Sequence, residues 1–155
     1  ENMDTPTALI FSRQNVKSLP EGTDYQQTRK GAYIVTGSDE QFDVILVASG
    51  SEVSTCVAGA ELLRKDGVKV RVVSALSEGL FRRQSKEYQE QILPRDAKIF
   101  GLTAGLPVTI EGLVGANGKV FGLNSFGFSA PYTVLDEKLG FTPENVYKQV
   151  KAFLA

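Results

Sequence analysis

The sequence predicts a three-layer α/β domain over residues 31–155, and three features carry this prediction. Apolar runs of strand length alternate with segments of helical periodicity. The run FDVILVA, residues 42–48, is almost wholly apolar, which is typical of a parallel strand covered on both faces. The chain has 155 residues, of which 42% are hydrophobic, so it can form one core without disulfides or a metal.

The strand over residues 42–48 begins the clearest unit of the prediction, a strand, a helix and a second strand. Ser51 is a suitable N-cap for the helix, and Glu52 lies in the first turn, where the helix dipole favours negative charge. Gly67 stands where a left-handed glycine ends many helices. Residues 68–73 alternate apolar and basic side chains, so we expect a strand with one face partly wet or covered by aliphatic stems. The apolar stripe of this helix is formed by Val53, Val57, Ala60 and Leu63.

Shorter elements surround this unit. The segment 106–114 is ambiguous, because Pro107 suits a helix start while Val108 and its neighbours prefer strands. The other predicted strands cover residues 32–35, 97–102 and 120–123, with turns at 37–39 and 115–118 and short helices at 80–84 and 85–93.

Two helices close the chain. The first covers residues 132–139 and ends at Gly140. The second has a complete start signal, with Thr142 as N-cap, Pro143 in the first helical position and Glu144 in the first turn. These signals predict that the last helix starts at Pro143.

The first thirty residues have a different character. Residues 7–11 are apolar and predict a buried strand, whereas residues 12–30 are polar and lack apolar periodicity. We therefore expect residues 1–30 to be the end of a preceding domain plus a linker, and residues 31–155 to be one α/β domain. The chain does not begin with methionine, and we expect it to be cut from a longer protein.

Composition excludes several kinds of function. The chain has no histidine, which excludes Ser-His-Asp or Cys-His catalysis and His-based zinc sites within it. The net charge of −1 gives no electrostatic case for nucleic-acid binding. There is no apolar stretch long enough to span a membrane. The single cysteine fits a reducing compartment.

Two residue patterns are candidates for anion binding. Arg13 directly follows the predicted strand 7–11, and ligands of open α/β sheets gather beyond the carboxyl ends of strands. Its guanidinium can grip a phosphate with two hydrogen bonds, although a surface arginine in a linker is the alternative. The Gly50-Ser51 turn at a helix N-terminus can also hold an anion, but Glu52 would repel one, so ordinary capping is the better interpretation.

Other candidates are weaker. The loop of residues 126–131, Phe-Gly-Phe-Ser-Ala-Pro, would either line a subunit interface or cover the edge of the core. Arg82 and Arg83 are better explained as a solvated helix face than as an anion site. Cys56 lies beside an apolar helix stripe, and we interpret it as a small core or boundary residue and not as a nucleophile.

An ordered series of short strings resembles transketolase. Residues 5–15, TPTALIFSRQN, resemble the segment that ends the pyrimidine-binding domain of that family, and ASGSEV at 48–53 resembles its next turn. FGFSAP at 126–131 and LGFT at 139–142 follow in the same order. Between residues 53 and 126, the segment 70–74 resembles the family's next strand, and the segment 81–94 resembles its F-x-x-Q…Y…L-P spacing. The match therefore spans nearly the whole chain.

The resemblance implies a transketolase C-terminal domain with a mixed, mostly parallel five-stranded sheet, one strand of which is antiparallel. It implies that the full enzyme is a cytoplasmic homodimer of the pentose phosphate pathway. Such an enzyme transfers a two-carbon ketol unit from a ketose phosphate to an aldose phosphate, using thiamine diphosphate and a divalent metal, Mg or Ca. In this family the cofactor, metal and catalytic residues belong to the preceding domains, so none is expected here. Only Arg13 carries over, as a contact to the substrate phosphate.

The sequence departs from the family pattern at three places. Thr103 replaces a usual glutamate, Ile110 a frequent tryptophan, and Phe128 a small or acidic residue. Two interpretations follow. The chain is either a transketolase domain, inactive alone and structural or dimer-supporting, or a stand-alone α/β module that binds an anion or nucleotide at the Gly50 turn. The missing start methionine and the strand predicted at 7–11 favour the first.

Overall fold

A computed structural model describes residues 6–37 and 41–155, and within these ranges five strands form one sheet in the order β1-β3-β2-β4-β5. β1 is antiparallel to β3, and all the other neighbours are parallel. This arrangement confirms the mixed, mostly parallel sheet. The strands are Tyr33–Thr36 (β1), Val44–Ala48 (β2), Val70–Ser74 (β3), Ile99–Leu102 (β4) and Lys119–Phe121 (β5).

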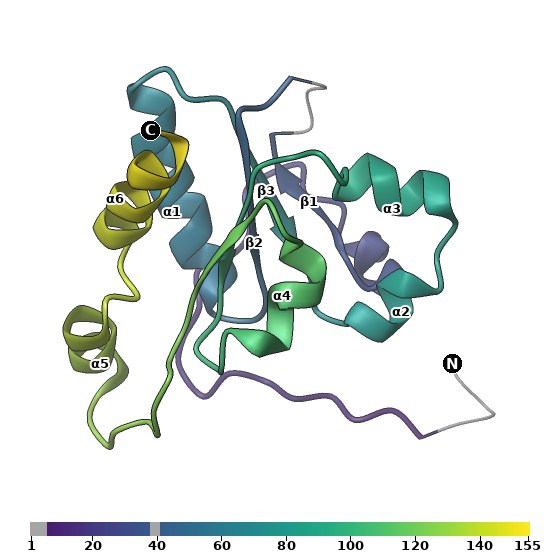
Figure 1. Cartoon of the computed structure of the whole chain (residues 1–155). Coiled ribbons are helices and arrows are strands. Elements are labelled where there is room, and N and C mark those ends of the chain that lie inside the picture. Colours follow the sequence, from purple (N-terminus) through teal and green to yellow (C-terminus); the bar gives the residue numbers. More distant parts are fainter. Residues whose placement is uncertain (1–5, 38–40) are drawn as a thin grey trace.

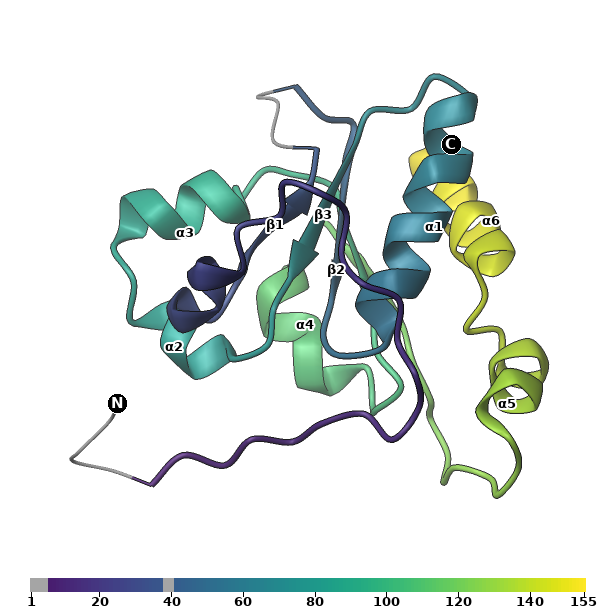
Figure 2. The ribbon, with the colours of Figure 1, turned by 180° about the vertical axis from the view of Figure 1, so that it is seen from behind.

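Helices cover both faces of the sheet, which confirms the three-layer architecture (Figure 1). One face carries α1, Glu52–Lys65, and α6, Pro143–Leu154, with α5, Tyr132–Leu139, leading into α6. The opposite face carries three short helices, and a 3₁₀ helix, η1, contacts α2 and β1. The three short helices are α2 (Glu78–Arg82), α3 (Lys86–Ile92) and α4 (Val108–Val114). The reverse view in Figure 2 shows η1 (Tyr25–Lys30) beside α2.

The central strands are buried on both faces because each face has its own apolar core. Leu46 and Val72 pack with α1 and α6, whereas Ile45 and Val47 pack with the three short helices. All five residues of β2 are buried, as the apolar run predicts. α1 and α6 make the most extensive helix–helix contact in the described chain, so α6 is a full member of the domain.

For the strand at 68–73 we expected one face to be partly wet or covered by aliphatic stems. The wet alternative is wrong for β3, because Val70–Ser74 are all buried. Arg71 is only 5% exposed. Its guanidinium donates to the backbone oxygen of Gln91 at 2.9 Å and lies 4.3 Å from the ring centre of Phe42. The basic residue is therefore buried because carbonyl oxygens and an aromatic ring surround it, which an alternating pattern alone does not reveal.

Helix boundaries follow local signals closely. The Thr142 side chain accepts a hydrogen bond from the Asn145 N–H, which confirms the predicted N-cap of α6. Gly67, which follows the C-cap Asp66 of α1, has φ of +79°, and Gly140, the C-cap of α5, has φ of +84°. The ambiguous segment at 106–114 contains α4.

α4 forms a helix because its apolar residues fit onto β4. Leu113 and Val114 are buried, and Ile110 packs onto Gly101. A Cβ atom on Gly101 would lie 2.7 Å from Ile110 Cδ1, so the glycine makes room for the helix. Tertiary packing thus overrides the strand preference of Val108 and its neighbours.

The buried strand predicted at residues 7–11 is wrong for this chain. The segment is not a strand, and Ile10 is 95% exposed. Within the described residues no strand pairs with it, so it has neither ladder hydrogen bonds nor a core to enter. The predicted linker also contains η1, whose N-cap Asp24 accepts a hydrogen bond from the Gln26 N–H. Part of the turn predicted at 37–39 lies outside the described residues.

Candidate functional site

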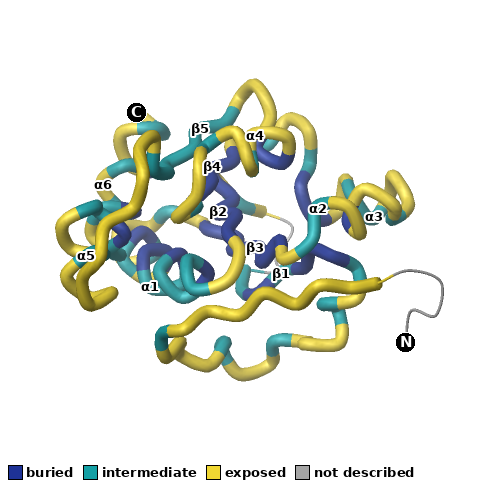
Figure 3. Tube along the Cα trace, turned by 90° about the horizontal axis from the view of Figure 1, so that it is seen from below, coloured by how far each residue is buried: buried dark blue, intermediate teal, exposed yellow. Residues whose placement is uncertain are grey.

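The candidate site lies at the carboxyl edge of the sheet, where β2, β3, β4 and β5 all end. Each of these strands leads into a turn or loop at that edge. Figure 3 looks onto this part of the molecule, and the exposed N-terminal segment runs across it. The fold therefore brings the segment that contains Arg13 to the loops that follow the parallel strands. Ligands of open α/β folds bind at such an edge.

The two anion-binding candidates of the sequence lie next to each other. Gly50 follows β2 and has φ of +63°, a left-handed conformation that suits glycine. The Ser12 hydroxyl oxygen lies 3.7 Å from the position that a Cβ atom on Gly50 would occupy. Because Arg13 is the next residue, the structure places it beside the Gly50 turn although 37 positions separate them in the sequence.

Arg13 itself is exposed. Among the described residues, its guanidinium has no hydrogen-bond or ion-pair partner. An arginine of this kind offers the whole planar donor fork to an incoming anion. Its position at the carboxyl edge fits a phosphate contact, and the role stays a prediction.

The Gly50 turn carries a carboxylate that opposes anion binding. Ser51 does not cap α1 as predicted, because it has already entered the helical conformation and its Oγ donates to Glu52 Oε1 at 2.7 Å. Burial raises the pKa of Glu52, and the nearby Asp136 carboxylate acts in the same direction. Hydrogen bonds from Ser51 and the backbone of Ala104 partly offset this rise. An anion that binds at this turn would therefore lie close to the carboxylates of Glu52 and Asp136.

Exposed apolar side chains occur in the N-terminal segment and in the loops and helices that follow the strands at the carboxyl edge, and together we call them the carboxyl-edge surface. Phe126 is 97% exposed and Phe128 65% exposed. Such exposure excludes the interpretation that the loop at 126–131 covers the core within this chain, and the interface interpretation remains. The surface consists of Leu9, Ile10, Phe11, Leu76, Leu80, Leu106, Val108, Phe126, Phe128, Tyr132 and Val134.

The remaining sequence candidates have structural roles. Cys56 is fully buried, and burial raises the pKa of its thiol far above the usual range, which confirms it as an inert core residue. Arg82 is largely exposed, as expected, but it also ion-pairs with Glu78 and donates to the Gly112 oxygen at 3.1 Å. Thr103, one of the departures, accepts a hydrogen bond from the Gly105 N–H at 3.1 Å.

Sequence reasoning missed two parts of this site. The surroundings of Glu52 include Ala104, in the loop after β4, and Asp136, in α5, which lie far away in the sequence. The carboxyl-edge surface is assembled from five separate segments, each with only a few apolar residues. The sequence signal that was available is positional. Apart from residues 9–11, which lie in the strand expected at 7–11, each of these residues closely follows an expected strand or belongs to the next helix.

Neither a metal centre nor a membrane span is found in the part of the chain that the structure describes. No three of its histidine, cysteine, aspartate or glutamate side chains lie together in a group able to hold a metal ion. None of its helices is both long and apolar enough to cross a membrane.

The chain is similar to known proteins over nearly its whole length. A family model described as the transketolase-like C-terminal domain matches residues 31–142. A transketolase of Staphylococcus epidermidis is 44% identical over 155 residues, which cover 98% of this chain and 23% of that protein. A transketolase 2 of Vibrio parahaemolyticus is 42% identical over 157 residues, which cover 100% of this chain and 24% of that protein. The chain therefore spans about a quarter of the length of these relatives.

Solved structures agree with the sequence comparison. A transketolase of Pichia stipitis in complex with sedoheptulose-7-phosphate has a TM-score of 0.83 and 32% identity. The similarity covers 92% of this chain and 20% of that one. At this level of identity and coverage, the match confirms the fold described above.

Proposed function

This chain belongs to the transketolase family and has the fold of its C-terminal domain, and from this premise we propose that it works as one domain of a ketol-transferring enzyme. The matched region is about a quarter of the relatives' length, so most of the reaction machinery would lie in the rest of such an enzyme. The enzyme would move a two-carbon ketol unit from a ketose phosphate to an aldose phosphate. The Pichia stipitis structure with a ketose phosphate supports this class of substrate.

The described residues do not fit the cofactors of this reaction. They hold no cluster of metal-ligating side chains, and the whole chain lacks histidine. We therefore assign thiamine diphosphate and the divalent metal to the rest of the enzyme and derive no step through them here. This chain would contribute by packing against the rest of the enzyme and by positioning the sugar phosphate.

The carboxyl-edge surface is the observation that carries the proposal. Exposed apolar patches of this kind mark sites where other protein surfaces dock. The patch includes the N-terminal segment, whose residues 7–11 lack a strand partner in the described chain. We propose that residues 1–30 are the end of a preceding domain and a linker, and that the surface packs on that domain or on the partner subunit of a homodimer.

Arg13 would be the one direct substrate contact of this chain. Arg13 is exposed, and the hydroxyl of its neighbour Ser12 lies beside the Gly50 turn at the carboxyl edge. In that position Arg13 would hold the phosphate end of a sugar phosphate by charge-assisted hydrogen bonds. The reacting carbons would lie at the far end of the sugar, so Arg13 would orient the substrate and would not take part in bond making.

We further propose that the enzyme is cytoplasmic and acts in the pentose phosphate pathway. The buried thiol of Cys56 is compatible with a reducing compartment. The alternative, a stand-alone module that binds an anion or nucleotide at the Gly50 turn, lacks a supporting contact among the described residues. Glu52 at that turn disfavours it.

The test of this proposal is an assay of ketol transfer by the 155-residue chain and by the protein at its native length. We expect activity with thiamine diphosphate and metal at native length, and none from this chain alone. Ketol transfer by this chain alone would overturn the assignment of the reaction machinery. Saturable binding of a nucleotide by the chain, lost in Gly50→Val, would favour the alternative.

A further inference from the structure

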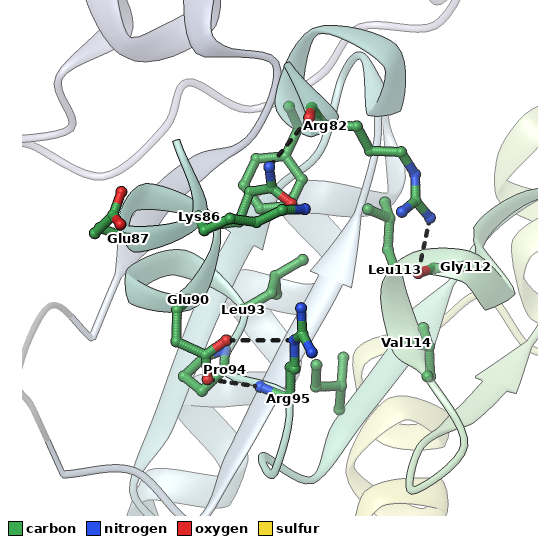
Figure 4. A pocket seen from close by; sticks show the side chains of 14 residues that line it. Arg82, Lys86, Glu87, Glu90, Leu93, Pro94, Arg95, Gly112, Leu113 and Val114 are labelled. Carbon is green, nitrogen blue, oxygen red and sulfur yellow. Dashed lines mark hydrogen bonds and ion pairs between the residues drawn. The ribbon is translucent and has the colours of Figure 1, made fainter. Parts of the chain in front are cut away.

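A groove of about 600 Å³ lies between α3 and α4, on the face of the sheet opposite α1 and α6 (Figure 4). We call it the α3–α4 groove. Its floor is formed by core residues, among them Phe81, Leu93 and Leu113, each of which is at least 90% buried. Because the floor belongs to the second apolar core, its shape is fixed by packing. None of the residues of the carboxyl-edge surface lines the groove.

Three cationic side chains surround the groove. Figure 4 shows the charged ends of Arg82, Lys86 and Arg95 converging on the hollow from different sides. Arg82 is held in place, because its Nη2 donates to the Gly112 oxygen and a Cβ atom on Gly112 would lie 2.7 Å from that nitrogen. Among the described residues, the Lys86 ammonium has no ion-pair partner.

The nearby carboxylates neutralise these cations only in part. Glu78 pairs with Arg82 along α2. Glu90 accepts a hydrogen bond from the Arg95 backbone N–H, while its distance of 4.0 Å to Arg95 Nε leaves the guanidinium loosely held. Glu87 points away from the hollow in Figure 4. Hydrogen bonds from its own N–H and from Ser85 keep the pKa of Glu87 low, so this carboxylate stays at the start of α3.

We propose that the α3–α4 groove binds a small organic phosphate, with the phosphate among Arg82, Lys86 and Arg95 and the organic part over the apolar floor. Arg95 supplies a loosely held donor fork and Lys86 an ammonium, which phosphates favour. Arg82 adds positive charge, although its Nε and Nη2 already contact Glu78 and the Gly112 oxygen. The groove is far larger than one phosphate group, and its floor is apolar, so an ester with an organic body fits better than an inorganic ion. This site is separate from Arg13 and does not depend on the proposed ketol transfer.

The test is a calorimetric titration with adenosine monophosphate, which combines a phosphate with a flat ring, and with inorganic phosphate. The protein is used at its native length and is saturated with thiamine diphosphate and metal, so that the cofactor site is closed to the probe. Lys86→Gln and Arg95→Gln each remove one charge from an exposed side chain. Lys148→Gln is the matched control, because this exposed lysine lies on α6 across the sheet. Arg13→Gln reports on binding at the carboxyl edge.

We expect saturable binding of adenosine monophosphate that weakens about five- to tenfold in each of Lys86→Gln and Arg95→Gln. Lys148→Gln and Arg13→Gln should leave it unchanged. Glu90→Gln should tighten it, since a carboxylate beside the phosphate is removed. Inorganic phosphate should bind more weakly than the nucleotide.

Three results would overturn the proposal. They are absence of saturable binding, equal affinity in the wild type and both groove variants, and weaker binding in Glu90→Gln. Circular dichroism of each variant confirms that the fold is intact.

Discussion

The Ser12 hydroxyl oxygen lies 3.7 Å from the point where a Cβ atom on Gly50 would stand, so the N-terminal segment and the turn after β2 are in contact range. This relationship brings the chain at Arg13, the next residue, to the carboxyl edge. It joins two candidates that looked independent in the sequence, an arginine in a polar linker and a glycine turn before a helix.

Gly50→Ala should destabilise the domain by about 1–2 kcal/mol, because φ of +63° is a left-handed conformation that residues with a Cβ atom resist. The free energy of unfolding in urea measures this loss. Gly79→Ala is the matched control. Gly79 lies in α2, where an added Cβ atom would meet nothing within 4 Å, and alanine there should stabilise by up to about 1 kcal/mol. Equal effects at both positions would contradict the strain argument.

The contact between α1 and α6 depends on Gly59. A Cβ atom there would lie 2.8 Å from Val146 Cγ1, and Val146 is only 1% exposed. Gly59→Ala should therefore destabilise by about 1 kcal/mol, although alanine is the better helix former. In the Val146→Ala background the same change should become favourable, with a coupling of about 1–2 kcal/mol in a double-mutant cycle. If the two substitutions change the free energy of unfolding additively, the close approach of α1 and α6 does not depend on Gly59, which would contradict this prediction.

Arg71→Met should destabilise by about 2–3 kcal/mol, since it leaves buried carbonyl oxygens without their donor. The guanidinium donates to Gln91 at 2.9 Å and to Gly37 at 3.4 Å, and so connects β3 to the start of the loop after β1 and to the end of α3. Chemical denaturation measures the loss. Arg83→Met, at an exposed position, is the control and should change stability little.

Glu52→Gln should stabilise the domain at neutral pH. Burial raises the folded-state pKa of Glu52 above its usual value of 4.5, so the folded state takes up a proton more readily than the unfolded chain. The associated stability is present below the unfolded pKa and is lost as the pH rises through the folded pKa. The gain from glutamine should therefore vanish on acidification below about pH 4.5, in unfolding experiments at several pH values. A gain that persists at acid pH would contradict this cause.

Asp66 is a control for Glu52, because its pKa is shifted in the opposite direction. Hydrogen bonds from Tyr147 and Lys151 lower the pKa of Asp66, so its stabilisation is present above the usual value of 3.8 and is lost as the pH falls through the folded pKa. Asp66→Asn should therefore reduce stability at neutral pH and have less effect in acid. The same effect at both pH values would show that the ionised hydrogen bonds are unimportant.

Local patterns predicted those elements whose signals are local. The run at 42–48 became β2, and Thr142 caps α6, because an apolar run and an N-cap act within a few residues. Arg71 in β3 and the helix α4 were not predictable in this way. Their conformations depend on Gln91 and Gly101, which lie elsewhere in the sequence and meet them only in the folded chain.

In the candidate site too, local sequence signals predicted some features, while others depend on contacts that form only in the fold. Arg13 was identified through a resemblance, and its position after an apolar run only suggested a role at the edge of a sheet. The proximity of its neighbour Ser12 to the Gly50 turn became visible only in the fold. The segment at 7–11 shows the converse, since an apolar run predicted a buried strand and the described chain provides no strand to pair with it. An apolar run indicates that a segment is buried in the complete protein, but it does not show which surface covers that segment.

The most direct test of the account is the kinetics of Arg13→Ala in the enzyme at native length, with a ketose phosphate and an unphosphorylated ketose as donors. We expect KM for the phosphorylated donor to rise at least about tenfold, because a charge-assisted hydrogen bond of about 1.5–3 kcal/mol is lost. The unphosphorylated donor should be nearly unaffected, and Arg83→Ala should change neither. An equal effect of Arg13→Ala on both donors would contradict the assignment of Arg13 to the substrate phosphate.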